Sequence, residues 1–343
     1  MRQRRPRLRD ELVTLAHGSG GKASRALVEG LFLEELGNPL LEPLGDAALL
    51  ELNGSRLAFT TDSYVVHPLE FPGGDIGELA VNGTVNDLAV AGATPVALSA
   101  GFVVEEGFEV ARLRRLAASM ARAADRAGVA VATGDTKVVE RGKADGLYVN
   151  TAGIGLVATG ARLGAGNVRT GDRVLVSGTL GDHGMAVMIA RGELQLEVEL
   201  ASDTAPVHEL TGSLLELSEQ VRWLRDPTRG GLATALNELA RDAGLAVALE
   251  EAALPLRPEV VGACELLGID PLYVANEGKL VAVVAAEAAD EALRRLRTHE
   301  LGAEAAIVGE VRAEPAGLVV LETTFGGSRI VDMLVGDPLP RIC

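Results

Sequence analysis

The sequence has few cysteines, few aromatic residues and no long hydrophobic run, and each scarcity excludes a class of protein. Its two cysteines, Cys264 and Cys343, can build neither a disulfide framework nor a zinc site, so a reducing cytoplasm is the simplest setting. No apolar run approaches the roughly 20 residues of a membrane span. With six Phe, three Tyr and one Trp, we expect a core of Val, Leu, Ala and Ile.

Basic residues are also scarce relative to acidic ones: the sequence has 32 Lys and Arg and 48 Asp and Glu, which gives a formal net charge of −16. This balance argues against nucleic acid as a primary partner. An anionic nucleotide would need metal ions or local cations in order to bind. Five arginines do occur within residues 2–9, but charged residues and no apolar segment follow them. We therefore expect a solvated tail and no secretion signal.

The length of 343 residues favours two domains, and the succession of strand and helix patterns predicts an α/β (α+β) fold. A glycine-rich change of composition at 160–166 indicates the linker. We expect a basic tail and glycine-rich lid over 1–37, domains over 38–159 and 160–330, and a flexible tail over 331–343. The predicted strands are 56–61, 96–104, 129–133, 147–157, 173–177, 245–250, 280–285, 305–311 and 318–321, and the main predicted helices are 23–36, 75–93, 111–127, 185–191, 232–243 and 287–301.

Four aspartates of the first half stand at strand ends or on the polar side of an apolar helix: Asp46, Asp62, Asp87 and Asp135. Carboxylates that share a pocket repel one another unless cations lie between them. Mg²⁺ takes oxygen ligands and keeps substrate phosphates in its shell. The sequence therefore predicts an acidic Mg²⁺–nucleotide site.

Two asparagines interrupt the apolar surface of the helix predicted over 75–93. Asn82 and Asn86 are four residues apart and so share a face. A stripe facing solvent is one interpretation. We favour a polar patch facing a ligand, because Ala, Val and Leu fill almost every other position of this helix. Asn150 lies on the strand predicted over 147–157.

Two glycine-rich segments are candidates for phosphate binding. Residues 17–22, His-Gly-Ser-Gly-Gly-Lys, form either a flexible loop or a phosphate lid. Residues 226–231, Asp-Pro-Thr-Arg-Gly-Gly, precede a predicted helix, so that Thr228, Arg229 and free N–H groups converge at its N-terminus. That arrangement favours an anion site, although an ordinary N-cap turn would have a similar sequence.

The sequence ends in Pro338-Leu-Pro-Arg-Ile-Cys343, preceded by a predicted turn at Gly336-Asp337. Two prolines stiffen this arm and exclude it from a helix interior or a central strand. A thiol on such an arm could enter a pocket, leave it and meet a partner. The alternative is a frayed end with an incidental cysteine. Cys264, in the apolar stretch 261–267, is expected to be a buried small hydrophobe.

Taken together, these motifs resemble those of the AIR-synthase-like ATP-binding family, and within it those of the hydrogenase maturation factors. The resemblance covers residues 12–343 and implies a two-domain PurM-like fold, whose N-terminal sheet domain pairs across a homodimer with ATP near that interface. Relatives often carry two adjacent acids where Gly45-Asp46-Ala47-Ala48 has one, which leaves a metal role for Asp46 open. The resemblance rests on 17–22, Thr61-Asp62-Ser63, Asn82-Gly-Thr-Val-Asn-Asp87, Thr133-Gly-Asp-Thr-Lys137, 226–231, Asn276-Glu277-Gly278 and Pro340-Arg341-Ile342-Cys343.

The resemblance also implies a reaction. HypF would load a carbamoyl group from carbamoyl phosphate onto Cys343, and ATP with Mg²⁺ would drive its dehydration to a thiocyanate. The cyano group would then pass to iron on a HypC–HypD complex. The rivals are a selenophosphate synthetase, a thiamine-monophosphate kinase, or a scaffold that uses nucleotide only to dock its tail.

By the same resemblance, Lys137 and Glu277 activate the thiocarbamate and remove its protons. We favour Glu277 as the base, because an acidic pocket opposes the lowering of the lysine pKa that a lysine base would need. Asp46, Asp62, Asp87 and Asp135 would hold Mg²⁺. The residues expected to bind the nucleotide are Asp62, Asn82, Asn86, Asp87, Asp135, Asn150, Asp226, Thr228 and Arg229.

Overall fold

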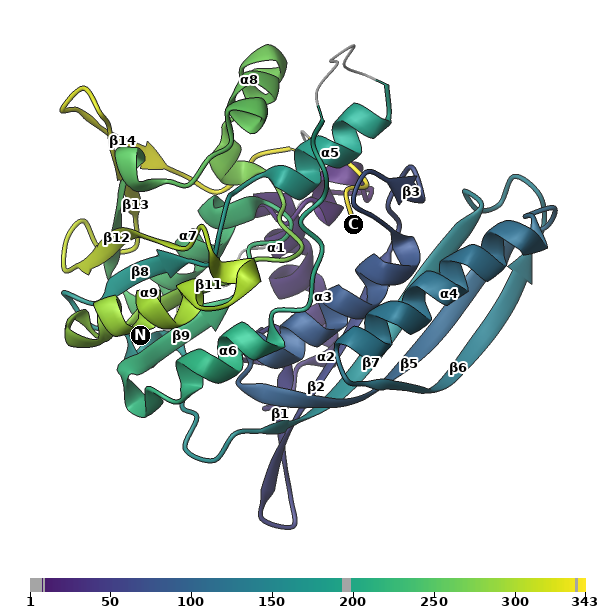
Figure 1. Cartoon of the computed structure of the whole chain (residues 1–343), viewed down its shortest axis with the longest axis horizontal. Coiled ribbons are helices and arrows are strands. Elements are labelled where there is room, and N and C mark those ends of the chain that lie inside the picture. Colours follow the sequence, from purple (N-terminus) through teal and green to yellow (C-terminus); the bar gives the residue numbers. More distant parts are fainter. Residues whose placement is uncertain (1–7, 9, 193–198, 337–338) are drawn as a thin grey trace.

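The computed structural model describes residues 8, 10–192, 199–336 and 339–343 and places them in two sheet domains joined by a buried seam (Figure 1). The arginines of the basic start, and Asp337 and Pro338, lie outside the described residues. Helix α1 (Lys22–Leu27), a π-helical turn (Val28–Phe32) and α2 (Leu33–Leu36) form the helix predicted over 23–36.

The N-terminal sheet has the strand order β1-β2-β7-β5-β6. All its neighbours pair antiparallel except β5 and β6, which are parallel. A small hairpin of β3 (Glu70–Phe71) and β4 (Gly74–Asp75) precedes the first long helix. The five strands are β1 (Ala48–Leu52), β2 (Ser55–Tyr64), β5 (Ala93–Glu105), β6 (Ala130–Val139) and β7 (Leu147–Val157).

Helices α3 (Ile76–Val90) and α4 (Val110–Arg126) cover one face of this sheet (Figure 1). The carboxylate of Asp75 caps α3 by accepting from the N–H groups of Gly77 and Glu78. Nearly every residue of α3 is small or apolar, and the helix is buried on all sides, because the sheet lies on one side and the C-terminal domain on the other. In contrast, α4 buries a single stripe that includes Leu116, Met120 and Ala123.

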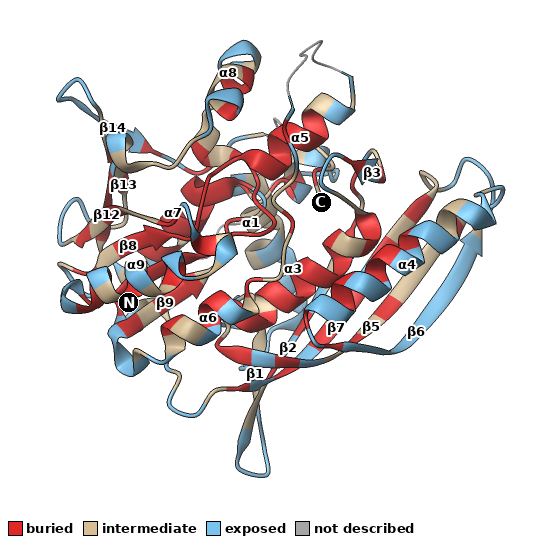
Figure 2. Cartoon of the chain, viewed as in Figure 1, coloured by how far each residue is buried: buried red, intermediate tan, exposed pale blue. Residues whose placement is uncertain are grey.

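The opposite face of the N-terminal sheet is exposed, although it carries large apolar side chains. Along β7, buried and exposed residues alternate, as expected for a strand with one covered face. Strand β6 at the sheet edge is exposed along almost its whole length (Figure 2). We call this surface the outer face; its exposed apolar residues include Phe59, Ile154 and Leu156.

The C-terminal domain holds a seven-stranded sheet in the order β14-β13-β10-β12-β8-β11-β9. Helix α7 (Gly231–Ala243) packs on one face, and α6 (His208–Leu215) and α9 (Ala289–Arg297) pack on the other. Helices α5 (Asp182–Ala190) and α8 (Pro258–Leu267) lie beyond the sheet. The strands are β8 (Arg173–Val176), β9 (Val221–Arg225), β10 (Ala246–Glu250), β11 (Val281–Val284), β12 (Ala306–Arg312), β13 (Val319–Glu322) and β14 (Ser328–Val331).

The predicted α/β class is confirmed, and each predicted main helix and strand has a counterpart. The sequence patterns missed β9, β14 and helix α6, which are short and lack clear punctuation. They also missed helix α8, whose residues 261–267 were read only as an apolar stretch. The core consists mainly of Val, Leu and Ala, as predicted. Among the described residues, no helix combines the length and the apolar character that crossing a membrane requires.

Candidate active site

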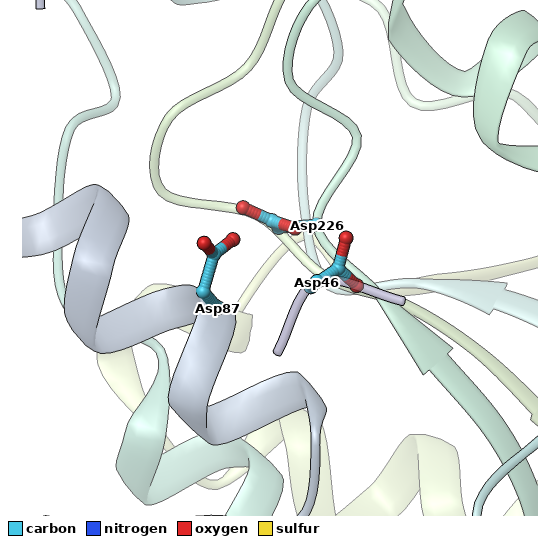
Figure 3. Close-up of side chains that lie close together, drawn as sticks. All are labelled: Asp46, Asp87 and Asp226. Carbon is cyan, nitrogen blue, oxygen red and sulfur yellow. The ribbon is translucent and has the colours of Figure 1, made fainter. Parts of the chain in front are cut away.

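Three aspartates from different parts of the chain meet at the seam between the domains (Figure 3). Asp46 precedes β1, Asp87 lies on α3, and Asp226 directly follows β9. One oxygen atom from each lies within 4.8 Å of the others. The cluster therefore offers converging carboxylate oxygens of the kind that hard divalent cations prefer.

Burial and mutual repulsion oppose the deprotonation of the three carboxyl groups and so raise their pKa values. Burial, partly offset by Arg225, raises the pKa of Asp46 to about 6. Burial and the charge of Asp46 raise the pKa of Asp226 to about 8. Burial and the neighbouring aspartates raise the pKa of Asp87 well above its ordinary value. Such a cluster gains most from a bound cation, which would replace protons between the carboxylates.

Asp62, the fourth candidate of the first half, lies on the same side of the sheet. The structure places it inside β2 rather than at the strand end, and the Tyr64 hydroxyl donates to its carboxylate at 3.2 Å. The hydroxyl of Thr60 donates to Asp87 at 2.7 Å. Asp62 and Thr60 line a cavity of about 260 Å³ together with the cluster, Thr228 and Arg229.

The segment 226–231 forms the other wall of this cavity. Gly230 and Gly231 have φ values of 78° and 60°, a backbone region that favours glycine. A Cβ atom at Gly231 would lie 2.5 Å from the carbonyl oxygen of Leu272. The guanidinium of Arg229 donates to the carbonyl of Gly18 at 2.9 Å. The glycine-rich segment 17–22 thus lies against the second phosphate-binding candidate, which places both candidates at one site.

Glu277 is buried beside this wall, with 3% of its surface exposed. Its backbone N–H donates to Asp203 at 3.0 Å, and Lys279 donates to the other oxygen of Asp203 at 3.0 Å. Burial, followed by the charges of Asp226 and Asp203, raises the pKa of Glu277 well above its ordinary value. A carboxylate with a raised pKa is a stronger base, provided that it is deprotonated in the working state.

The last residues of the sequence lie in the same region. Cys343, Arg229 and Gly18 line a small cavity of about 50 Å³, and Arg229 also lines the acidic cavity. Cys343 is half-buried. Cys264 is buried on α8, and burial raises the pKa of its thiol to about 12, which confirms its predicted character as a small hydrophobe.

The structure places Asn82 and Asn86 differently from our prediction. Both are buried in the seam, where Asn82 donates to the hydroxyl of Thr204 at 3.1 Å. Asn86 donates to the carbonyls of Ala205 and Glu277 and accepts from the N–H of Val207. In this arrangement their amides join the two domains, so the polar stripe faces protein and not an open ligand site.

Asp135, Lys137 and Asn150 lie on the outer face, away from the aspartate cluster. The β5–β6 register sets Asp135 opposite Gly101, which in turn is opposite Asn150 on β7. Asp135 and Lys137 pair with each other at 2.6 Å, with more than two thirds of each side chain exposed. This corrects the expectation of one cluster within a single chain: α3 and the aspartates Asp62 and Asp87 lie on the opposite side of the sheet.

Sequence reasoning missed three groups at the site, namely Arg225, Asp203 and His183. Arg225 pairs with Asp46 at 2.9 Å and with Glu238 at 2.7 Å, and so offsets the acidic cluster. Asp226 was predicted to bind the nucleotide but not to join the aspartate cluster; its place directly after a strand was a usable signal. Asp203 and His183 had no local signal, because their partners lie far away in sequence.

Comparisons with known proteins define the class to which this fold and site belong. Residues 44–157 match the family described as AIR synthase related protein, N-terminal domain. Residues 169–322 match the corresponding C-terminal domain family. The two matches coincide with the two sheet domains, so the class is that of the two-domain AIR synthase related proteins.

Individual relatives narrow this class. The carbamoyl dehydratase HypE of Rhodobacter capsulatus is 57% identical over 339 residues, which cover 98% of this chain and 99% of the relative. A solved HypE–HypF complex contains a chain with 48% identity and a TM-score of 0.86, covering 90% of this chain and all of that one. A HypE structure in complex with ATP has 47% identity and a TM-score of 0.81, covering 97% and 100%. The chain belongs to the HypE family of carbamoyl dehydratases.

Proposed function

We propose that this protein is an ATP-dependent carbamoyl dehydratase of hydrogenase maturation, which converts an S-carbamoyl group on Cys343 to an S-cyanate. The observation that carries the proposal is the position of Cys343. Its thiol-bearing segment lies in a cavity lined by Arg229, the residue that also lines the acidic, phosphate-sized cavity. The family membership and the solved ATP complex of a relative support the same reaction.

The chemistry follows from the poor leaving ability of an amide oxygen. Phosphoryl transfer from ATP to the carbamoyl oxygen creates a good leaving group, and loss of two protons from nitrogen then leaves C≡N on sulfur with ADP and phosphate released. Thr228 and Arg229 bind the phosphates. The buried carboxylate of Glu277 accepts a proton from nitrogen.

The residues present fit Mg²⁺. Asp46, Asp87 and Asp226 bring oxygen ligands within 4.8 Å of one another, and Asp62 lines the same cavity. Burial, together with the neighbouring carboxylates, raises their pKa values, and a bound cation would favour the deprotonated forms. A bound Mg²⁺ would neutralise the phosphates of the nucleotide. Arg225 would remain as the resident cation on Asp46.

A homodimer would bring the outer face into use. This face exposes apolar side chains such as Phe59 and Ile154, which pair with each other across β2 and β7. Burying them against a second copy is favourable. The same face carries Asp135 and Lys137. We assign these two residues to the site of the other copy, so that each site takes the aspartate cluster from one chain and the partner's Lys137 from the other.

The remaining partners supply and receive the group. HypF would load the carbamoyl group onto Cys343, as the solved HypE–HypF complex of a relative supports. A HypC–HypD complex would accept the cyano group on its iron, which is cargo in this scheme.

Intact mass measurement of the Cys343 segment tests the proposal. Incubation with HypF, carbamoyl phosphate and ATP should first add about 43 Da to the tail and then remove about 18 Da, since the second step loses water from the carbamoyl group. Omission of ATP after loading should leave the heavier adduct. A tail that never gains mass, or a heavier adduct that ATP does not change, would refute the reaction.

Two cysteine variants serve as matched controls. Cys343→Ala should abolish both adducts while nucleotide binding persists, because the aspartate cluster lies on other elements. Cys264→Ser should retain both adducts, because that thiol is buried on α8 with a raised pKa. Loss of the adduct in the Cys264→Ser variant alone would overturn the assignment of the carrier.

A further inference from the structure

The five tail residues 339–343 lie in a seat that is built from both domains. The N–H of Val65 donates to a terminal carboxylate oxygen of Cys343 at 3.0 Å, and the N–H of His67 donates to the carbonyl of Arg341 at 3.2 Å. Ile342 is 2% exposed and packs in the N-terminal core. The tail therefore adds to the segment 65–67 much as a peptide adds to a strand edge, by backbone hydrogen bonds and the two buried side chains of Leu339 and Ile342.

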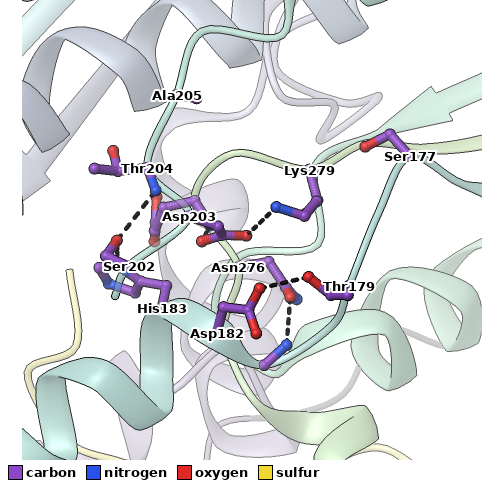
Figure 4. Close-up of polar contacts among 12 residues, drawn as sticks. Ser177, Thr179, Asp182, His183, Ser202, Asp203, Thr204, Ala205, Asn276 and Lys279 are labelled. Atoms are coloured by element: carbon purple, nitrogen blue, oxygen red, sulfur yellow. Dashed lines mark hydrogen bonds and ion pairs between the residues drawn. The ribbon is translucent and has the colours of Figure 1, made fainter. Parts of the chain in front are cut away.

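His183 on α5 contacts the tail from the other domain. Its Nε2 atom lies 2.9 Å from the carbonyl oxygen of Ile342, and its Nδ1 atom lies 2.8 Å from the hydroxyl of Ser202. That hydroxyl accepts from the N–H of Thr204 (Figure 4) and so points its own proton at Nδ1. The imidazole is then neutral with its proton on Nε2, where it donates to the tail. Burial lowers the pKa of His183, which favours the same form.

The geometry around the ring leaves His183 little freedom. It is fully buried, and its ring meets that of Phe71 edge-on with 5.4 Å between centroids. The segment that holds Ser202 is fixed in turn, because the N–H of Ser202 donates to the carbonyl of Pro72 at 2.8 Å. The tail carbonyl is the one acceptor of His183 Nε2–H among the described residues, so a withdrawn tail would leave this buried donor without that partner, which favours the docked tail.

Arg341 supplies the charged contact of the seat. Its Nε donates to the carbonyl of Val65 at 3.1 Å, and its guanidinium pairs with Asp145. Arg191 donates to the carbonyls of His67 and Arg341 at 2.6 and 2.5 Å. The carboxylate of Asp145 favours a cationic residue at position 341. Because the Arg341–Asp145 pair is half-exposed, water can solvate both charges and the pair separates at little cost in free energy.

We propose that His183 and Asp145 are positioning residues that recognise Ile342 and Arg341, and so hold the thiol of Cys343 beside Arg229 for dehydration. The assignment rests on the proposed function of Cys343 as carrier. The seat combines the buried hydrogen bond from His183 and several backbone hydrogen bonds with one solvated ion pair. It is therefore specific for the sequence Arg-Ile-Cys and releasable, as a carrier that visits other proteins requires.

Amide hydrogen exchange at Val65 and His67 reports docking without any reaction, because both N–H groups donate to the tail. Full-length Ile342→Asp provides the undocked reference, since a buried carboxylate expels the tail. His183→Phe keeps a ring but removes the donor, and should shift exchange most of the way to that reference. His183→Gln restores an N–H donor and should return exchange towards wild type. Wild-type exchange in His183→Phe would overturn the role of His183.

Charge reversal tests the ion pair by a double-mutant cycle. Asp145→Lys and Arg341→Glu should each speed exchange at His67, and the double variant should recover slow exchange. Failure of the double variant to recover any protection would overturn the role of Asp145.

A chemical readout separates this seat from the proposed function. After loading by HypF, His183→Phe should accumulate the heavier adduct and dehydrate at least tenfold more slowly, and His183→Gln should recover at least part of the rate. If amide exchange shows that the tail docks through His183 but the wild-type protein forms no adduct on Cys343, the carrier function is refuted and the docking role of His183 stands. If the His183→Phe variant exchanges its Val65 and His67 amides at the wild-type rate while the wild-type protein dehydrates its adduct normally, the proposed role of His183 is refuted and the proposed function stands.

Discussion

Two Asp–Lys pairs of this protein have similar geometry and opposite surroundings. Asp203 and Lys279 lie 3.0 Å apart in the seam with 4% and 10% of their side chains exposed (Figure 4). Asp135 and Lys137 lie 2.6 Å apart on β6 with 69% and 68% exposed. The buried pair is complete, because its aspartate also accepts from the backbone of Glu277. The exposed pair is screened by water and remains available to another chain.

The same contrast holds for the two regions as wholes. The seam brings together the aspartates, Arg229, Glu277 and Cys343, and buried partners hold several of its polar groups, such as the backbone N–H of Glu277 that donates to Asp203. The outer face exposes apolar side chains, and it also exposes the charged side chains of Asp135 and Lys137. A single chain thus builds the electrostatics of the site, and we infer that a second chain completes it.

The largest expected effect concerns the base in the seam. Glu277→Gln preserves size and hydrogen bonding but removes the acceptor for the proton, so dehydration should fall by about 10²–10⁴-fold. Carbamoylation of Cys343 and ATP binding should persist, and the heavier adduct should accumulate in the mass spectrum. Dehydration at the wild-type rate would show that Glu277 is not the base, and that Lys137 of the outer face or a water molecule accepts the proton.

A mixing experiment tests whether the exposed side completes the site of another copy. Glu277→Gln and Lys137→Ala should each be inactive in dehydration. Co-expressed with different tags, they form mixed dimers in which one of the two sites is intact, so purified mixed dimers should regain about half of the wild-type activity. No recovery in purified mixed dimers would show that both residues serve the same chain.

The two Asp–Lys pairs should differ in what they contribute to stability. Asp203→Asn leaves Lys279 buried without its charge partner and should lower the free energy of unfolding by about 3–5 kcal/mol. Asp135→Asn on the exposed strand should leave the denaturant midpoint unchanged. Urea unfolding of both variants measures the contrast, and equal midpoints would contradict it.

The smallest expected effect is the pH dependence of the aspartate cluster. The pKa of Asp226 is raised to about 8, and that of Asp46 to about 6. The stability that the protonated forms contribute is fully present below their ordinary pKa near 4 and is lost as pH rises through these values. Without Mg²⁺, the melting temperature should therefore fall between about pH 6 and pH 8.

Mg²⁺ supplies the control for this prediction. Since the metal binds the deprotonated cluster, it should raise the melting temperature more at about pH 8 than at about pH 6. Asp87→Asn should reduce this increment, whereas Glu314→Gln on an exposed loop should not. An equal increment at both pH values would count against metal binding by the cluster.

Much of the site could be predicted from the order of residues alone. Asp62 was singled out at a predicted strand end and Asp87 as a polar position on an apolar helix. Asp226, Thr228 and Arg229 belong to the segment that precedes a predicted helix, and the structure brings all five residues to one cavity. Local patterns suffice for this because a strand or helix that is apolar except at one position usually presents that position to a site. Their roles in binding remain predictions.

The remaining contacts depend on partners far away in the chain. Asn82 and Asn86 form a helical polar stripe whether they face a ligand or another domain, and 119 or more residues separate them from the groups they contact. Similarly, Asp135 carries the same local pattern as Asp62, and only the register of β6 against β5 assigns it to the outer face. Pairing of distant segments is not encoded in a short window of sequence.

The sequence by itself determined the elements, their apolar faces and the family, because periodicity and motif spacing are local properties. Only the tertiary structure decided which charges are buried. It gathered Asp46, Asp87 and Asp226, sealed Glu277 and His183 in the seam, and left Asp135 and Lys137 in water. The physical reason is that the pKa and the strength of an ion pair depend on the dielectric surroundings, which arise only when distant segments pack together.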